Sequence, residues 1–218
     1  GLLAIAGGMF TQGSMGGEIG HEDDEVIRSV TLTRTLLVGR NEITRGQWSA
    51  MVPNTPAPGG CDGPTCPVAC VNLYESMYFL NQWSAAEGLT ECYTLSDCMG
   101  TPGTSSCSQG NAEVCEGNYS CTGADLVGLD CNGYRLPTEA EGEYLTRAGT
   151  SSAHYLGSPA DDSCVNPDIS RLAWWCGNGD NRTHRVGGKS SNPFGIQDTL
   201  GNVEEWTSDG FGPRSAEM

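Results

Sequence analysis

Two carboxylates near the end of the chain, Asp198 and Glu205, have the surroundings of cation ligands. They lie in the stretch Asn192–Asp209, where oxygen donors alternate with apolar residues, and Gly201-Asn202 between them predicts a tight turn. Calcium takes about six to eight oxygens from side chains and main chain, at spacings that only a bent backbone can supply. The stretch therefore predicts a calcium site. The alternative is a plain turn before a strand, with Asp198 bonded to backbone amides, Glu205 in solvent and Trp206 in the core.

Few other side chains offer chemistry. The three histidines, His21, His154 and His184, include no pair with the spacing of a helical metal motif, so an iron site would need all three to converge in the fold. The sequence has neither a serine nucleophile motif nor a phosphate-binding glycine loop. Trp174-Trp175 could form a ligand platform or belong to the core. We therefore predict no catalytic residue and no cofactor other than calcium.

Eleven cysteines occur in local clusters, within loops rich in Gly, Ser, Thr and Asn. Zinc is an alternative, but few histidines lie nearby, so we favour disulfides and with them an oxidising compartment: secreted, extracellular or periplasmic. The best local pairs are 61–66, 92–98 and 164–176. The odd count leaves one thiol over. We expect it to be Cys70, because Val68-Ala-Cys-Val71 has the pattern of a buried strand.

The formal net charge of −16 limits the partners that the chain can have. Such a charge repels nucleic acids and anionic membranes and suits cation binding, although it also simply makes a surface soluble. No apolar run of about 20 residues could span a membrane. Residues 1–8 are apolar but lack the positive flank of a signal peptide, so we expect the chain to be a mature, processed form.

The elements that position the candidate site are predicted to be short. Leu2–Phe10 and Val26–Arg34 predict strands, the second with Arg28, Val30 and Leu32 on one face. Residues from about 92 to 131 are rich in Cys, Gly and Ser without periodicity, which predicts an insertion ordered by disulfides rather than by a core. With 31 glycines and 11 prolines among 218 residues, loops should outweigh long helices.

Three helices are predicted to begin with the same capping chemistry, in which a short polar side chain is followed three residues later by Glu or Gln. The pairs are Thr44 with Gln47, Asn72 with Glu75, and Thr138 with Glu141. The second and third helices should stop at Gly88 and Gly149. A glycine inside the third helix, Gly142, costs about 1 kcal/mol relative to alanine, so this helix should be less firmly anchored.

Two long motifs, in order and at the right separation, resemble those of the formylglycine-generating-enzyme (sulfatase-modifying-factor) family. Phe194–Asp198 with Gly201–Trp206 is similar to the family signature FGLYDM-GNVWEW, and Arg135–Glu141 is similar to RLPTEAE. Phe10–Ser14 and Asn41–Thr44 are weaker matches. The resemblance implies a single α+β domain over residues 1–218, with a loop-rich, C-type-lectin-like formylglycine-generating-enzyme fold, and the disulfides would stabilise it.

The same resemblance implies a calcium ligand set. Its members are the side chains of Asp198 and Glu205 and the main-chain carbonyls of Gly201 and Val203.

The resemblance also implies an oxidase that converts a cysteine to formylglycine through copper and oxygen. In the family the working cysteine pair follows an RGGSW strand downstream of the tryptophan signature, and Arg214–Ala216 does not match that strand. Glu204 stands where the family has tryptophan. We therefore expect a secreted, calcium-stabilised binding or structural module that lacks the catalytic cysteine segment, with a protein or glycan partner or self-assembly. The alternative is an oxidase of the formylglycine-generating or related non-haem-metal type, present as a truncated chain.

Overall fold

The computed structural model describes residues 1–19, 21, 23, 25–56, 60–107, 115–116, 118–152, 154–157 and 164–209. Its helices are α1 (Arg45–Met51), α2 (Leu73–Ala86), α3 (Glu139–Arg147) and α4 (Pro167–Leu172). Its strands are β1 (Leu2–Ile5), β2 (Met9–Gln12), β3 (Arg28–Thr31), β4 (Leu36–Gly39), β5 (Tyr93–Ser96), β6 (Ser106–Cys107), β7 (Cys115–Glu116) and β8 (Gly123–Leu126). None of these helices is long and apolar enough to cross a membrane.

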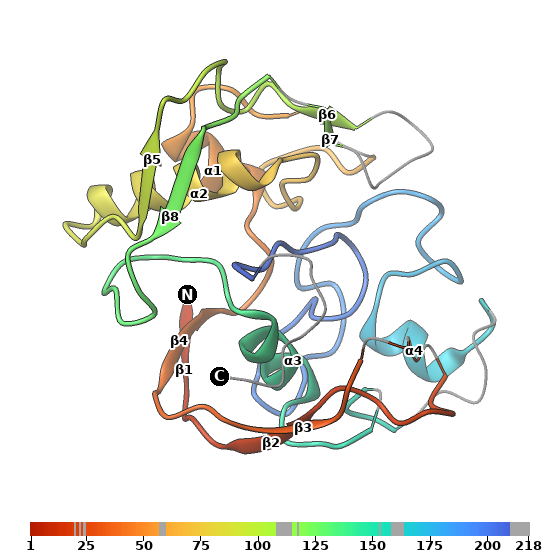
Figure 1. Ribbon diagram of the computed structural model, residues 1–218. Coiled ribbons are helices and arrows are strands. Elements are labelled where there is room, and N and C mark those ends of the chain that lie inside the picture. The colour runs from red at the N-terminus through yellow and green to blue at the C-terminus, as the bar shows by residue number, and fades with distance from the viewer. Residues whose placement is uncertain are drawn as a thin grey trace.

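The elements fall into two groups. Figure 1 shows α1, α2, β5 and β8 at one end of the molecule, and β1–β4 with α3 and α4 at the other. Each group has its own hydrophobic cluster, one built around Trp48 and Phe79 and the other around Ile5 and Tyr144. The loops after residue 173, drawn in blue, lie between the two groups. The predicted cation loop is therefore held where the two groups meet.

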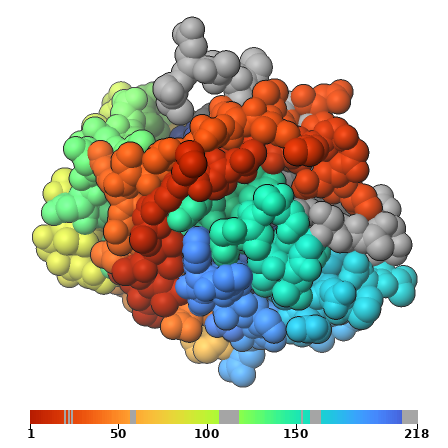
Figure 2. Space-filling view, turned by 90° about the horizontal axis from the view of Figure 1, so that it is seen from below, coloured from red at the N-terminus to blue at the C-terminus, as the bar shows by residue number. Residues whose placement is uncertain are grey.

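The first four strands form one bent hairpin, because β1 pairs with β4 and β2 pairs with β3. The strand predicted over Leu2–Phe10 is interrupted between Ile5 and Met9. Gly7 lies in this break, where only glycine fits, because a Cβ would lie 2.2 Å from the Leu32 carbonyl oxygen of the opposite arm. The alternation predicted for the other arm is confirmed, since Arg28 and Val30 are half-buried while their neighbours are exposed. Figure 2 shows these strands beside α3 on one face of the molecule.

All three predicted capping boxes are present, in α1, α2 and α3. In each box the cap side chain accepts from the third backbone amide, and the Glu or Gln accepts from the amide of the cap. Helices α2 and α3 end next to Gly88 and Gly149, which have positive φ as predicted. An added Cβ at Gly142 would meet nothing within 4 Å, so the missing side chain leaves open space and no gap in the core.

The disulfides confirm two of the three predicted pairs, Cys61–Cys66 and Cys164–Cys176. The pair 92–98 is wrong, because Cys92 bonds Cys131 and Cys98 bonds Cys121. The reason is strand β5 between the two cysteines, since an extended strand holds its ends apart by about 3.3 Å per residue. Antiparallel pairing of β5 with β8 instead brings a partner to each end of the strand.

The expectation that Cys70 is the free thiol is also wrong, because Cys70 is disulfide-bonded. Its backbone is not a strand but a bend with a left-handed φ of 60°. All nine cysteines whose side chains the structure describes are disulfide-bonded. The side chains of Cys107 and Cys115 lie outside the described residues.

The insertion at 92–131 is ordered by more than disulfides. Its strands pack on the core, with Tyr93 only 3% exposed. Glu75 of α2 is fully buried, and its Oε1 accepts from the backbone N–H groups of Gly103 at 2.9 Å and Ser105 at 3.3 Å. The capping carboxylate of α2 thus also anchors a loop of the insertion, which local sequence patterns did not predict.

Candidate metal centre

Two segments that are far apart in the sequence run side by side at the candidate site. Residues 40–43 connect β4 to α1, and they lie against residues 197–203. The first contact is main chain to main chain, from Gln197 N–H to the Arg40 carbonyl at 2.8 Å. The others come from the side chains of Asn41 and Glu42. Because regular elements flank residues 40–43 on both sides, this segment can brace the loop opposite.

Asp198 is 3% exposed, and its two carboxylate oxygens have different surroundings. Oδ2 accepts from Gly187 N–H at 2.6 Å and from Asn41 Nδ2 at 3.1 Å. Oδ1 is buried and has no hydrogen-bond partner in the part of the chain that the structure describes. Asp198 has a left-handed φ of 58°, a conformation that Asp tolerates better than most residues. A buried carboxylate oxygen without a donor is costly, and a missing ion is one physical explanation for it.

The turn after Asp198 is fixed by Asn202, which has a left-handed φ of 64°. Its Oδ1 accepts from His184 N–H at 2.8 Å, and its Nδ2 donates to the His184 carbonyl at 3.1 Å. Nδ2 also donates to Glu42 Oε2 at 2.7 Å. Glu42 Oε1 accepts from Val203 N–H at 3.2 Å. The Asn202 side chain is thus fully used, and the backbone of the turn has little freedom.

Two main-chain oxygens of the turn are available as ligands. Neither the Gly201 carbonyl nor the Val203 carbonyl accepts a hydrogen bond from another described residue. Gly201 could not be replaced by a larger residue, because a Cβ would lie 2.1 Å from the Trp174 carbonyl oxygen. Its φ of +72° also favours glycine. The close approach to Trp174 therefore fixes where the Gly201 carbonyl lies.

Three carboxylates, Glu42, Asp198 and Glu205, interact electrostatically around this turn. Burial raises the pKa of Glu42 to about 9, and the negative charge of Asp198 adds to the shift. Surrounding protein raises the pKa of Glu205 to about 7, again with a contribution from Asp198. Glu205 is nevertheless an exposed residue, so solvent reaches the site on this side. A cation could reach the site from this side, and its charge would relieve the repulsion among the carboxylates.

The donor set fits calcium better than a transition metal. Among the described residues, no group of three or more His, Cys, Asp or Glu side chains is arranged to hold a metal ion. A site here would combine Asp198 Oδ1 and Glu205 with the two main-chain carbonyls, and waters would complete the shell. Such a mixture of hard oxygens is typical of calcium.

Trp174 supports the turn and offers no free face for a ligand. The His184 ring stacks on its indole at 3.8 Å between centroids, and Lys189 Nζ lies 3.7 Å from the indole centroid. Two groups this close to one centroid must occupy opposite faces of the ring. Trp174 therefore does not form the ligand platform that was considered for Trp174-Trp175. Its backbone carbonyl accepts a hydrogen bond from Asn202 N–H at 2.8 Å and so supports the turn.

The other residues considered for chemistry have separate surroundings. His21 contacts Ser14 and Glu25 in the loop between β2 and β3, whereas His154 is buried and His184 stacks on Trp174. The histidines therefore have no common partner among the described residues. Trp206 is 44% exposed, and its Nε1 donates to the Val71 carbonyl, so it is not the core residue that the simple strand alternative requires.

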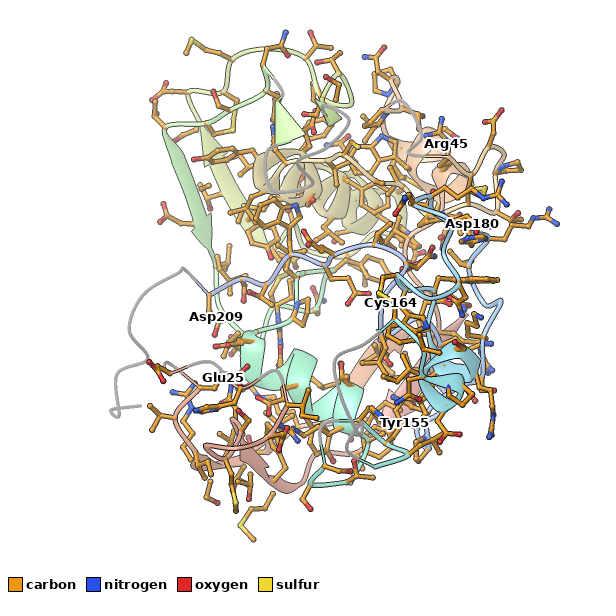
Figure 3. All side chains as sticks on the ribbon, turned by 90° about the vertical axis from the view of Figure 1, so that its right-hand side faces the viewer. Glu25, Arg45, Tyr155, Cys164, Asp180 and Asp209 are labelled. Carbon is orange, nitrogen blue, oxygen red and sulfur yellow. A yellow bond between two sulfur atoms is a disulfide. The ribbon has the colours of Figure 1, made fainter. Side chains whose placement is uncertain are left out.

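Beyond Trp206 the chain returns to α3. Asp209 Oδ1 accepts from Glu139 N–H at 2.9 Å, and Figure 3 shows Asp209 at the end of its segment beside that helix. The stretch that carries the candidate ligands is thus tied at both ends, to residues 40–43 and to the start of α3.

Sequence reasoning did not predict the roles of Asn41 and Glu42. Their segment, Asn41–Thr44, shows only a weak match to the family. A polar Asn-Glu pair directly before a capped helix gives no local sign that it contacts a loop about 160 residues away.

Comparisons with known proteins agree with the motifs. A family model described as "Sulfatase-modifying factor enzyme 1-like domain" matches residues 1–217. Over 196 residues the chain is 29% identical to "Chaperone protein LppX" of Paenibacillus barcinonensis, which covers 82% of this chain and 63% of that protein. Over 91 residues it is 37% identical to the formylglycine-generating enzyme of Mycobacterium tuberculosis, which covers 37% of this chain and 29% of that enzyme. The chain thus spans less than two thirds of the length of these curated relatives.

Among solved structures, the chain is similar to Treponema denticola variable protein 1. The TM-score is 0.71 at 25% sequence identity, and the match covers 99% of this chain and 74% of that one.

Proposed function

The chain belongs to the family of sulfatase-modifying factor enzyme 1-like domains, and we propose that it is a secreted or periplasmic, calcium-stabilised module that binds another protein. The observation that carries the proposal is the buried Asp198 Oδ1, which has no donor among the described residues. The other oxygen, Oδ2, accepts hydrogen bonds from Asn41 and Gly187, and these bonds fix the orientation of the carboxylate. Oδ1 therefore cannot turn toward the same two donors.

Calcium would be held by Asp198 Oδ1, the Glu205 carboxylate and the carbonyls of Gly201 and Val203. When bound, the ion supplies positive charge beside three carboxylates that otherwise repel one another. Asn202 and Glu42 then hold the turn, and the ion and its waters would enter beside the exposed Glu205. The ion would thus join residues 40–43 to the loop that lies between the two groups of elements.

The disulfides support a location outside the reducing cytosol. Cys61–Cys66, Cys92–Cys131, Cys98–Cys121 and Cys164–Cys176 are formed, and disulfides persist in oxidising compartments. We also infer that the fold is a single loop-rich domain of the C-type-lectin-like kind. Short helices and two-stranded sheets among the described residues support this inference.

A protein partner is favoured over other ligands by the relative that bears the name of a chaperone, which matches most of this chain. The nine cysteines whose side chains are described are bonded in disulfides, so none of them is available as a thiolate ligand for the copper of an oxidase. A glycan partner or self-assembly remain the competing forms of a binding or structural role.

An oxidase is the second candidate. It is favoured by the 37% identity to a formylglycine-generating enzyme over 91 residues. Fold alone does not decide between these functions, because one scaffold can carry several.

Activity and binding assays on one preparation separate the two candidates. The oxidised protein is tested for suppression of light scattering by heat-denatured citrate synthase, and for copper-dependent oxygen uptake with a cysteine-containing peptide. We expect suppression at roughly equimolar protein and no oxygen uptake. Copper-dependent conversion of the peptide cysteine would favour the oxidase, and unchanged scattering would contradict chaperone-like binding. Elemental analysis of the dialysed protein checks the ion, with about one calcium per chain expected.

A further inference from the structure

Glu42 is a buried carboxylate beside the candidate calcium ligands, yet it is not one of them. We propose that Glu42 is a positioning residue of the calcium site, which holds the turn that carries the main-chain ligands. This inference rests on the calcium site proposed above. It assigns a role to the Asn41–Thr44 segment that the ligand set does not explain.

Glu42 contacts the ligand-bearing turn through both of its carboxylate oxygens. Glu42 is 8% exposed, and both its oxygens are used on the turn opposite. Oε2 accepts from Asn202 Nδ2 at 2.7 Å, and Oε1 accepts from Val203 N–H at 3.2 Å. Asn202 follows the proposed ligand Gly201, and Val203 is itself a proposed ligand through its carbonyl. One carboxylate therefore sets the position of both main-chain ligands.

Glu42 is surrounded by neutral hydrogen-bond donors and negative charges. Its hydrogen-bond donors among the described residues are both neutral, an amide side chain and a backbone N–H. The charged groups that act on it, Asp198 and Glu205, are negative as well. Without a cation the fold thus buries a carboxylate beside two others, which is unfavourable. A bound multivalent cation removes this conflict, and glutamine could not replace Glu42 because its NH₂ group would face one of the two donors.

Residues 40–43, which present Glu42 to the turn, are held on both sides. Residues 40–43 lie between β4 and α1, and Ile43 beside Glu42 accepts from Val68 N–H at 2.8 Å. Asn41 holds Asp198 from the same segment. Glu42 is therefore presented to the turn by a backbone fixed on both sides, as expected of a residue that orients ligands.

The test compares Glu42→Gln and Glu42→Asp with the wild type. Glu42→Gln keeps the shape but replaces one acceptor oxygen by an NH₂ group, whereas Glu42→Asp keeps both acceptors and shortens the reach. Glu204→Gln is the matched control, because Glu204 is an exposed carboxylate of the same loop and the same charge is lost. Calorimetric titration gives the Kd for Ca²⁺ and for La³⁺, and melting in chelator gives the stability of the metal-free form.

We expect Glu42→Gln to weaken calcium binding roughly 10- to 100-fold, the range typical of groups that orient metal ligands. Its metal-free melting temperature should be lower than that of the wild type, because one donor of the turn loses its acceptor. Glu42→Asp should weaken both ions by a similar factor, and Glu204→Gln should leave both affinities within about twofold.

Three results would overturn the inference. A loss of calcium affinity in Glu204→Gln equal to that in Glu42→Gln would assign the effect to the charge of the loop and not to positioning by Glu42. Wild-type affinity in Glu42→Gln would remove its role while leaving the calcium site intact. Absence of calcium binding by the wild-type chain would instead overturn the proposed site, and this inference with it.

Discussion

The loss of the Asp198 charge should separate the calcium site from a plain turn. In Asp198→Asn, the amide oxygen can still accept from Asn41 Nδ2 and Gly187 N–H, as Oδ2 does in the wild type. The substitution removes the charge and places an NH₂ group at the position of the orphaned Oδ1. We therefore expect the metal-free protein to keep its stability, and calcium to lose its effect on that stability.

The magnitude follows from mass action. Calcium at 100 times its Kd stabilises the wild type by about 2.7 kcal/mol if it binds only the folded chain. For a chain of about 150–250 residues each kcal/mol shifts Tm by roughly 2–4 °C, so wild-type Tm should fall by about 5–10 °C in chelator. In Asp198→Asn this difference should vanish.

Asp198→Ala supplies the contrast. It leaves both donors without their acceptor, at about 1–3 kcal/mol for each buried donor that stays unpaired. Its Tm in chelator should therefore lie at least about 4 °C below that of the chelated wild type. The assay is differential scanning calorimetry with calcium and with EDTA. The reasoning is refuted if chelation leaves the wild-type Tm unchanged, or if Asp198→Asn keeps the full calcium shift.

Three further predictions concern the fold and the pH dependence. Glu75→Ala should lower the free energy of unfolding by about 3 kcal/mol or more and should make the loop at Gly103 sensitive to limited proteolysis, because buried N–H groups lose their acceptor; an unchanged cleavage pattern would contradict the anchor. Gly142→Ala should raise the free energy of unfolding by about 0.5–1 kcal/mol in urea titration, since its Cβ would meet nothing within 4 Å; a decrease would mean that the site is not open. In chelator, Tm should decrease as pH rises from about 4.5 through about 7, because the folded chain holds the Glu205 proton more tightly than the unfolded chain does, so this contribution is complete at low pH and is lost as pH passes the raised pKa. Calcium should reduce this loss, and a chelated Tm that rises over the same range would be inconsistent with the carboxylate repulsion.

Local patterns in the sequence predicted the parts of the fold that depend on neighbouring residues. The capping boxes at Thr44, Asn72 and Thr138 are all present, because each involves a side chain and an amide three residues apart. The disulfides Cys61–Cys66 and Cys164–Cys176 were predicted for the same reason, since each closes a short local loop. The family motifs are local as well, since each is a continuous stretch of chain, and one of them contains all the candidate ligands.

The cysteines of the insertion mark where local reasoning fails. Proximity in sequence favoured Cys92 with Cys98, but an extended strand separates them and strand pairing selects their partners. Cys70 was expected to be buried and free, yet its bend and its disulfide depend on contacts that its neighbours do not encode.

The candidate site divides in the same way. The resemblance to the family, carried by the sequence, predicted which oxygens could serve a cation, and Asp198, Gly201, Val203 and Glu205 belong to one continuous stretch. Only the tertiary structure decided that Asp198 Oδ2 accepts hydrogen bonds whereas Oδ1 has no donor among the described residues. It also decided that Glu42 contacts a turn about 160 residues away in the sequence. Those features depend on how β4 and α1 present residues 40–43 to the loop. Long-range packing of this kind leaves no periodicity or spacing in the sequence, so no local pattern could have revealed it.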